Sequence, residues 1–228
     1  MYSNRPNLTI GFHGCDESVC NQLVTVPGIV RTSKESFDWL GHGFYLWENN
    51  YERALKWAVD KKKRGKLEKP SVVGVVYQLD HCLDFSDTFY IDLIAFYYEM
   101  MKEEFLQAKA TLPKNRDLPY DLHHDLIIRE LDCSVIEYMH LKISEEISTN
   151  IQTKGFSSLT QFDTVRGIFT EGGPAFEGAG IQNKNHIQVC IRNLNCIKGF
   201  FIPRQKNDSS FINLNDPPHH WHPRLCRL

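Results

Sequence analysis

Apolar and polar residues alternate along two separate segments of the chain, and this alternation is typical of half-buried β-strands. Residues 8–15 (LTIGFHGC) and residues 186–193 (HIQVCIRN) both show it. Residues 71–79 (SVVGVVYQL) are apolar almost throughout, which predicts a central strand that is buried on both faces. Further strands are predicted at residues 196–203 (CIKGFFIP) and, short or extended, at residues 43–47.

A helix is predicted to begin at Tyr51 and to end near Lys63. Asn50 is a favourable N-cap, because its side chain can accept a hydrogen bond from a free backbone N–H of the first turn. Ala54 and Trp57 then recur at helical spacing. The helix ends in KKKRGK, whose cations suit the negative end of the helix dipole. The same basic residues are compatible with RNA or DNA as a binding partner.

The middle of the chain has helical rather than strand periodicity. Residues 87–110 and 125–147 carry apolar side chains at helical spacing, so residues 86–150 are expected to form an all-helical insertion between strands. Residues 157–180 are rich in glycine and predict a loop. Strands on both sides of a helical insertion indicate a single α+β domain over residues 1–228.

Composition narrows the class of protein only slightly. The chain has 228 residues, of which 42% are hydrophobic, so it can bury a substantial core. The net charge of −2 gives no global basic field that would attract nucleic acid or a membrane. No apolar segment has the length of a membrane span or of a signal peptide core, so we expect a cytoplasmic location and no membrane partner.

The metal-binding residue types do not form a recognisable site in the sequence. The seven cysteines are widely spread and none forms a Cys-x-x-Cys pair, which favours reduced thiols and excludes the usual zinc spacing. The C-terminal segment contains His219, His220 and His222. Without neighbouring cysteines or carboxylates, we interpret these histidines as surface residues and expect no metal.

Chemistry-bearing residues concentrate in two segments. Residues 39–57 (WLGHGFYLWENNYERALKW) place Gly43 just before the aromatic Tyr45, and a glycine at this point lets a ligand approach the main chain closely. Tyr45 could serve as a platform for a planar ring, or it could simply be part of the core. The first predicted strand ends in His13 and Gly14, about thirty residues upstream.

A strand that ends in His-Gly, followed by Gly-x-Gly-Phe-Tyr running into a helix, resembles the His-Tyr-Glu class of ADP-ribosyltransferases. This class includes the diphtheria-toxin-like exotoxins and the poly(ADP-ribose) polymerases. The resemblance covers about half of the chain. It implies a split pair of mostly antiparallel sheets that are packed face to face, with NAD bound in the cleft between them. The helical insertion has no counterpart that we identify in the minimal domain of the family.

The resemblance also implies roles for individual residues. His13 would bond a ribose hydroxyl of NAD, Gly14 would hold the nicotinamide amide through its backbone, and Tyr45 would stack on nicotinamide. The second aromatic side chain that closes the nicotinamide pocket would be Trp57, with Tyr51 as second choice. The imidazole of His13 and the phenol ring of Tyr45 are therefore expected to flank the bound pyridinium.

The third position of the family pattern differs in this chain. The family has a glutamate where residues 186–193 carry Gln188, and glutamine offers hydrogen bonds but no charge. Glu171 and Glu177, in the predicted loop before this strand, could restore a carboxylate or act on the acceptor as a general base. The alternative is that both are solvated loop acids.

The sequence thus predicts an intracellular mono-ADP-ribosyltransferase that transfers ADP-ribose from NAD to a protein or nucleic acid. A bacterial toxin, with an antitoxin protein as a further partner, or a phage-defence effector fits this size. Poly(ADP-ribose) formation is not expected, since Gln188 replaces the glutamate that polymerising members use. The alternatives are a non-catalytic module that binds NAD or ADP-ribose, and a helical interaction domain in which the two motifs are coincidental.

Overall fold

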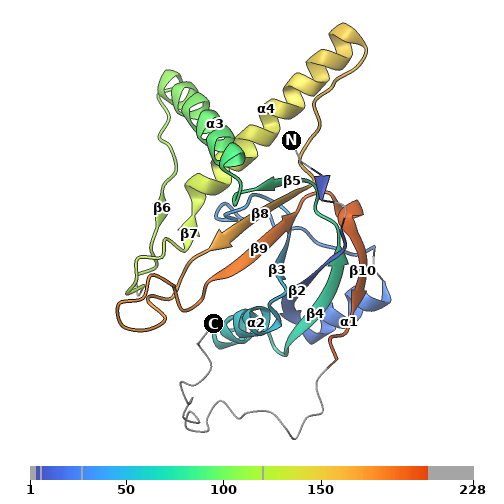
Figure 1. Ribbon diagram of the computed structural model, residues 1–228, viewed down its shortest axis with the longest axis vertical. Helices are drawn as coiled ribbons and strands as arrows, with labels where there is room; N and C mark the ends of the chain where they lie inside the picture. Colours follow the sequence, from blue (N-terminus) through green and yellow to red (C-terminus); the bar gives the residue numbers. More distant parts are fainter. Residues whose placement is uncertain (1–3, 6, 27, 120, 205–228) are drawn as a thin grey trace, which may run out of the picture.

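The computed structural model describes residues 4–5, 7–26, 28–119 and 121–204 of the chain. Its centre is an eight-stranded sheet in the order β1-β5-β8-β9-β3-β2-β4-β10 (Figure 1). The only parallel pair among the described strands of this sheet is β5 with β8, and the other pairs are antiparallel. The strands are β1 (Asn4–Arg5), β2 (Thr9–Asp16), β3 (Phe44–Glu48), β4 (Pro70–Tyr77), β5 (Asp80–Asp84), β8 (Thr164–Phe169), β9 (His186–Ile191) and β10 (Ile197–Phe201).

The helices lie at opposite ends of this sheet. α3 (Thr88–Gln107) and α4 (Glu130–Lys154) project together from one end, and α2 (Tyr51–Lys63) lies against β2 and β4 at the other (Figure 1). α1 (Glu17–Thr25) follows β2, and a 3₁₀ turn, η1 (Leu194–Cys196), follows β9. The predicted α+β class is therefore confirmed.

The sheet consists of two halves with a weak junction. β2 pairs with β4 over eight residue pairs but with β3 over only two, in which Gly11 faces Glu48 and Phe12 faces Trp47. Beyond Phe12 the β2–β3 ladder stops. The expected face-to-face packing of two sheets is therefore wrong, because the strand pairing is continuous and the halves lie side by side.

Neighbouring residues of β3 and β9 face opposite sides of the sheet, as in any strand. The first side, which we call the Gln188 face, is packed against α2 and α4 and carries Tyr45, Trp47, Gln188 and Cys190. The second side, the Phe44 face, is packed against α1 and carries Phe44, Leu46, Val189 and Ile191. The core therefore lies on both faces of the sheet.

The predictions of α2 and β4 are confirmed, because each of these elements is determined mainly by its own residues. α2 spans the predicted residues, and the side chain of Asn50 accepts a hydrogen bond from the backbone N–H of Arg53. β4 is buried along most of its length, as its valine-rich sequence predicts. The insertion differs from the prediction in two respects. Its second helix spans Glu130–Lys154 instead of residues 125–147, and a small two-stranded ladder of β6 (Asn115–Arg116) and β7 (Ile128–Arg129) lies between its two helices.

The prediction of a loop over residues 157–180 is wrong for the first part of this range, because β8 lies there and is an inner strand of the sheet. An ion network holds this strand in place. The guanidinium of Arg166 donates to both carboxylate oxygens of Glu48 on β3 at 2.9 Å and contacts Asp84 on β5. The hydrogen bonds that Arg166 donates to Glu48 raise the pKa of Arg166, so the arginine stays charged between these two carboxylates.

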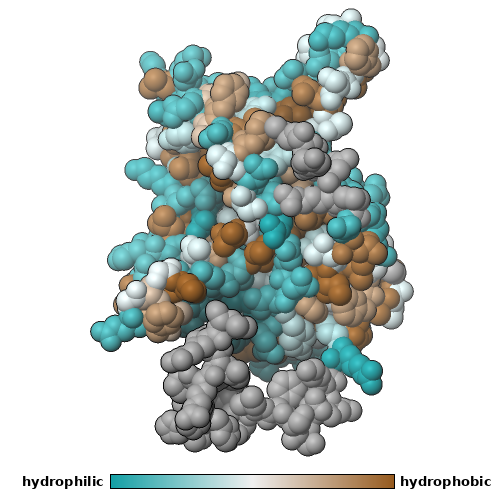
Figure 2. Space-filling view, in the orientation of Figure 1, coloured by the Kyte–Doolittle hydropathy of each residue, from teal (hydrophilic) through white to brown (hydrophobic). Residues whose placement is uncertain are grey.

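The six described cysteines are free and buried, in agreement with the prediction of reduced, packed thiols. On the side of the molecule drawn in Figure 2, hydrophobic side chains are scattered among hydrophilic ones and do not form one broad apolar patch. Isolated apolar side chains of this kind are normal on a protein surface.

Candidate functional site

His13 and Tyr45 meet at the point where the two halves of the sheet separate. Nδ1 of His13 lies 2.9 Å from the main-chain oxygen of Tyr45, and the imidazole packs against Phe44 with ring centroids 4.5 Å apart. The ring of Trp57 on α2 is 6.5 Å away. Because a carbonyl oxygen can only accept, Nδ1 carries the proton and Nε2 is left as an acceptor.

The charge state of His13 follows from its surroundings. Burial lowers the pKa of His13 to about 4, although the bond to the carbonyl of Tyr45 acts in the opposite direction. The imidazole is therefore neutral near pH 7. A neutral histidine with a fixed Nδ1–H can accept a hydrogen bond from a hydroxyl group through Nε2.

The side chain of Tyr45 does not face His13. Its ring lies on the Gln188 face among Leu40 and Cys190, and its hydroxyl donates to the oxygen of Gly41 at 2.8 Å and accepts from the N–H of Leu40 at 3.0 Å. Burial raises the pKa of Tyr45, so the phenol is protonated. The expectation that the imidazole and the phenol flank one ligand is not met, because His13 packs on Phe44, whose side chain points to the other side of the strand.

The two motif glycines have packing roles. A Cβ at Gly14 would lie 2.2 Å from the backbone oxygen of Ala54 in α2, and a Cβ at Gly43 would lie 2.5 Å from Sγ of Cys190. Neither glycine has a positive φ angle, so close approach and not backbone geometry excludes larger residues here. Gly14 therefore lets α2 sit directly on β2.

The two aromatic residues proposed to close the nicotinamide pocket, Trp57 and Tyr51, pack against different neighbours. Trp57 is next to Trp47, with ring centroids 5.3 Å apart, and Nζ of Lys61 lies 3.8 Å from the centroid of Trp57. Tyr51 instead packs edge-on against Phe12 at 5.7 Å. Of the two, only Trp57 lies close to His13.

Gln188 is covered by a residue that the sequence did not single out. Nε1 of Trp39 donates to Oε1 of Gln188 at 2.6 Å, and the indole packs edge-on against Phe169 at 5.0 Å. The guanidinium of Arg129, just before α4, lies 4.2 Å from the ring of Phe169 and 5.2 Å from that of Trp39. Gly167 gives the indole room, because a Cβ there would be 2.7 Å from it.

The two loop acids have different environments. Glu171 is only 7% exposed and forms an ion pair with Arg53 of α2, so a solvated loop acid is the wrong interpretation for this residue. Nδ1 of His186 lies 4.0 Å from Oε1 of Glu171. Glu177 is exposed. Only Glu171 is thus held against the helix that follows the tyrosine motif.

Polar atoms without a hydrogen-bond partner gather around the ion pair of Arg53. Nε of Arg53, Nε1 of Trp47 and Nε2 of His186 are all buried without one. The rings of Trp47 and His186 are 6.4 Å apart. Buried polar atoms are nearly always paired in proteins, so this part of the Gln188 face has unused capacity for a polar ligand.

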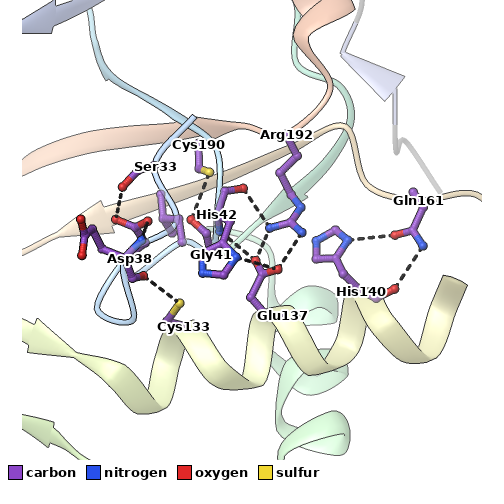
Figure 3. A network of polar contacts seen from close by, with 12 residues as sticks. Ser33, Asp38, Gly41, His42, Cys133, Glu137, His140, Gln161, Cys190 and Arg192 are labelled. Atoms are coloured by element: carbon purple, nitrogen blue, oxygen red, sulfur yellow. Dashed lines mark hydrogen bonds and ion pairs between the residues drawn. The ribbon is translucent and has the colours of Figure 1, made fainter. Parts of the chain in front are cut away.

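The segment that leads into β3 is fastened to α4. The carboxylate of Glu137 accepts from the backbone N–H of His42 at 2.8 Å and pairs with the guanidinium of Arg192 (Figure 3). At the other end of the segment, Asp38 accepts from the hydroxyl of Ser33 at 3.0 Å. The segment that carries Trp39 therefore has fixed ends.

Within the described residues, no group of three or more His, Cys, Asp or Glu side chains is arranged to hold a metal ion. His219, His220 and His222 lie outside the described residues. No helix in the part of the chain that the structure describes is both long enough and apolar enough to cross a bilayer.

In comparisons with known proteins, no family model matches the chain, and no curated protein or solved structure matches it.

Proposed function

We propose that this protein is a mono-ADP-ribosyltransferase that uses NAD as its substrate. The observation that carries the proposal is the contact between two motifs that are 32 residues apart, because Nδ1 of His13 bonds to the main chain of Tyr45 where β2 and β3 separate. The pairing of β2 with β3 ends at Phe12, so His13 and Gly14 lie where the two strands diverge.

The reaction would break the bond between C1′ of the ribose and the nicotinamide nitrogen, and nicotinamide would leave with the bonding electron pair. A nucleophile on the acceptor would then bond to C1′ and release a proton. The transition state has oxocarbenium character, and groups that favour it accelerate the reaction. Nε2 of His13 is an available acceptor for a ribose hydroxyl, and Trp57 supplies an aromatic surface 6.5 Å from the imidazole.

Gln188 limits how fast such a site would work. Its carboxamide supplies no negative charge, and its oxygen already accepts the indole N–H of Trp39. Of the two loop carboxylates considered as alternatives, Glu171 is the buried one, but it neutralises Arg53. We therefore infer slow transfer to a protein or nucleic-acid acceptor, without polymer formation. A cytoplasmic toxin or phage-defence effector, held inactive by an antitoxin, fits this activity.

The test is incubation with NAD labelled in its adenine half, together with cell lysate, purified RNA and DNA. We expect label to enter one acceptor class, and the label to be lost when His13 is replaced by alanine. No transfer and no release of nicotinamide, at enzyme concentrations comparable to that of NAD, would contradict the proposal.

The second candidate function is a non-catalytic module that binds NAD or ADP-ribose. The observation that favours it is the engagement of Gln188 by Trp39, because the residue at the family's glutamate position is here both uncharged and occupied. Calorimetry separates the two functions. The module would bind NAD and leave it intact over hours, whereas the transferase would consume it.

A further inference from the structure

Lys61, in the last turn of α2, lies beside two residues of the site proposed for NAD. Its Nζ atom is 3.8 Å from the ring centroid of Trp57, and the ring centroids of Trp57 and His13 are 6.5 Å apart. The ammonium group is therefore within about 10 Å of the imidazole. His13, Trp57 and Lys61 are all partly exposed, so a ligand from solvent can contact each of them.

The positive charge of Lys61 is not neutralised by a carboxylate among the described residues. In the same turn of α2, Nζ of Lys63 pairs with Asp60 at 3.0 Å. Nζ of Lys61 forms no ion pair or hydrogen bond with the residues that the structure describes, and it lies instead over the indole of Trp57. An ammonium group has three N–H donors, so Lys61 retains the capacity to bind an anion.

The charges around Lys61 also favour an anion. Burial lowers the pKa of Lys61, and the positive charges of Lys66 and Arg64 lower it further. The carboxylates of Glu35 and Asp38 act in the opposite direction with smaller effects. An anion next to Nζ would favour the charged form of the lysine and offset the repulsion among the three cations.

NAD has an anionic group at the corresponding place. His13 is proposed to accept a hydrogen bond from a ribose hydroxyl, and the diphosphate of NAD is attached to C5′ of the same ribose. A cation within about 10 Å of the imidazole is close enough to meet this diphosphate. The nicotinamide, the adenine and the two riboses have no negative charge, so the diphosphate is the part of NAD that an ammonium group attracts.

We propose that Lys61 binds the diphosphate of NAD and that its Nζ atom leaves the ring of Trp57 when it does so. The face of Trp57 under Nζ is a site for a cation, and the nicotinamide ring of NAD is a pyridinium cation. This face cannot hold the ammonium and the pyridinium together without repulsion between like charges. Charge-assisted hydrogen bonds to the diphosphate hold the ammonium away from the ring and remove the conflict. The inference rests on the proposed function, since it assigns a binding residue for NAD in that site.

The first experiment compares NAD with nicotinamide riboside, which has the pyridinium and one ribose but no phosphate. Calorimetry measures the binding of both to the full chain and to Lys61→Met, which keeps most of the length of the side chain and removes the charge. We expect Lys61→Met to bind NAD about tenfold more weakly than the wild type. It should bind nicotinamide riboside about threefold more tightly, because the competing ammonium is gone.

The matched control is Lys62→Met, which removes the charge of the next residue of α2, an exposed lysine. It should bind both ligands as the wild type does. Lys61→Arg keeps the charge and should bind NAD within about threefold of the wild type. A general loss of structure in Lys61→Met would weaken both ligands together, so the opposite signs for the two ligands separate binding of the diphosphate from a packing role.

The second experiment follows the displacement of Lys61 from Trp57 by NMR. The ring current of the indole shifts the Cε protons of Lys61 in the free protein, and the signal is assigned by its loss in Lys61→Met. Saturating NAD should move these protons toward the ordinary lysine position. ADP-ribose, which has the diphosphate but no nicotinamide, should move them in the same direction, because the diphosphate is what attracts the ammonium.

Three outcomes would overturn the inference alone: Lys61→Met binds NAD as tightly as the wild type, it weakens NAD and nicotinamide riboside equally, or the Cε protons do not move at saturation with NAD. Failure of the wild type to bind NAD would overturn the inference together with the proposed function. NAD that binds through Lys61 but is never cleaved would support the inference and leave the non-catalytic module as the function.

Discussion

Trp39 and Gln188 are 149 residues apart, yet the indole N–H of Trp39 donates to the side-chain oxygen of Gln188 at 2.6 Å. The contact joins the segment before β3 to the middle of β9. It also decides what Gln188 can do, because an oxygen that already accepts one hydrogen bond has only one remaining lone pair for a ribose hydroxyl.

Gln188→Glu is expected to raise the rate of NAD turnover roughly tenfold to a hundredfold, if the rest of the site is competent. A carboxylate accepts the N–H of Trp39 as well as the amide does and still offers negative charge to the developing oxocarbenium ion. The measurement is release of nicotinamide under single-turnover conditions. Gln188→Leu is the control that removes hydrogen bonding without adding charge, and an equal rate for both variants would exclude a role for this position.

Gly14→Ala is expected to destabilise the protein by about 3 kcal/mol, since the added Cβ would lie 2.2 Å from the backbone oxygen of Ala54. The matched control is Gly199→Ala, because a Cβ at Gly199 on β10 meets no atom within 4 Å. Urea unfolding gives both free energies of unfolding. If Gly14→Ala were as stable as the control, α2 would not rest on β2 as described.

The elements that sequence patterns predicted are those that depend on nearby residues. α2 could be placed because Asn50 caps it and Ala54 and Trp57 follow at helical spacing. β8 was missed because it is short, contains Gly167, and is stabilised by pairing with β5 and β9, which are far away in the sequence.

In the candidate site, too, only the features that depend on nearby residues could be predicted from the sequence. The motifs identify His13 and Tyr45, but side chains alternate along β3, and this places the rings of Phe44 and Tyr45 on opposite faces of the sheet. Burial of Glu171 depends on Arg53, which is 118 residues away. No local pattern encodes such a pair, so the sequence could not distinguish Glu171 from the exposed Glu177.

Glu171→Gln is expected to cost about 3 kcal/mol of stability, because it leaves the guanidinium of Arg53 buried without a counter-charge. Glu177→Gln should change stability by less than about 0.5 kcal/mol, since Glu177 is exposed. Thermal and urea unfolding of the two variants provide the comparison. A loss of NAD turnover in Glu171→Gln without loss of stability would instead assign this carboxylate to catalysis.

Stability should fall as the pH drops from 6.5 toward 4, in part through His140. Burial, and the charge of Arg192, lower the pKa of His140 to about 4, whereas Gln161 and Glu137 act in the opposite direction. In the unfolded chain the pKa of the same group is near the ordinary histidine value of 6.5. Between these two pKa values the unfolded state binds an extra proton and is stabilised relative to the folded state. Above pH 6.5 neither state binds it, and the full contribution is present.

For His140 alone this loss is about 2 kcal/mol at most by pH 5. Other groups also titrate in this range, so the informative quantity is the difference between two pH profiles. His140→Leu should be less stable at pH 7 but should lose less on acidification than the wild type does. Parallel profiles for the two proteins would mean that His140 is protonated in the folded state near pH 6.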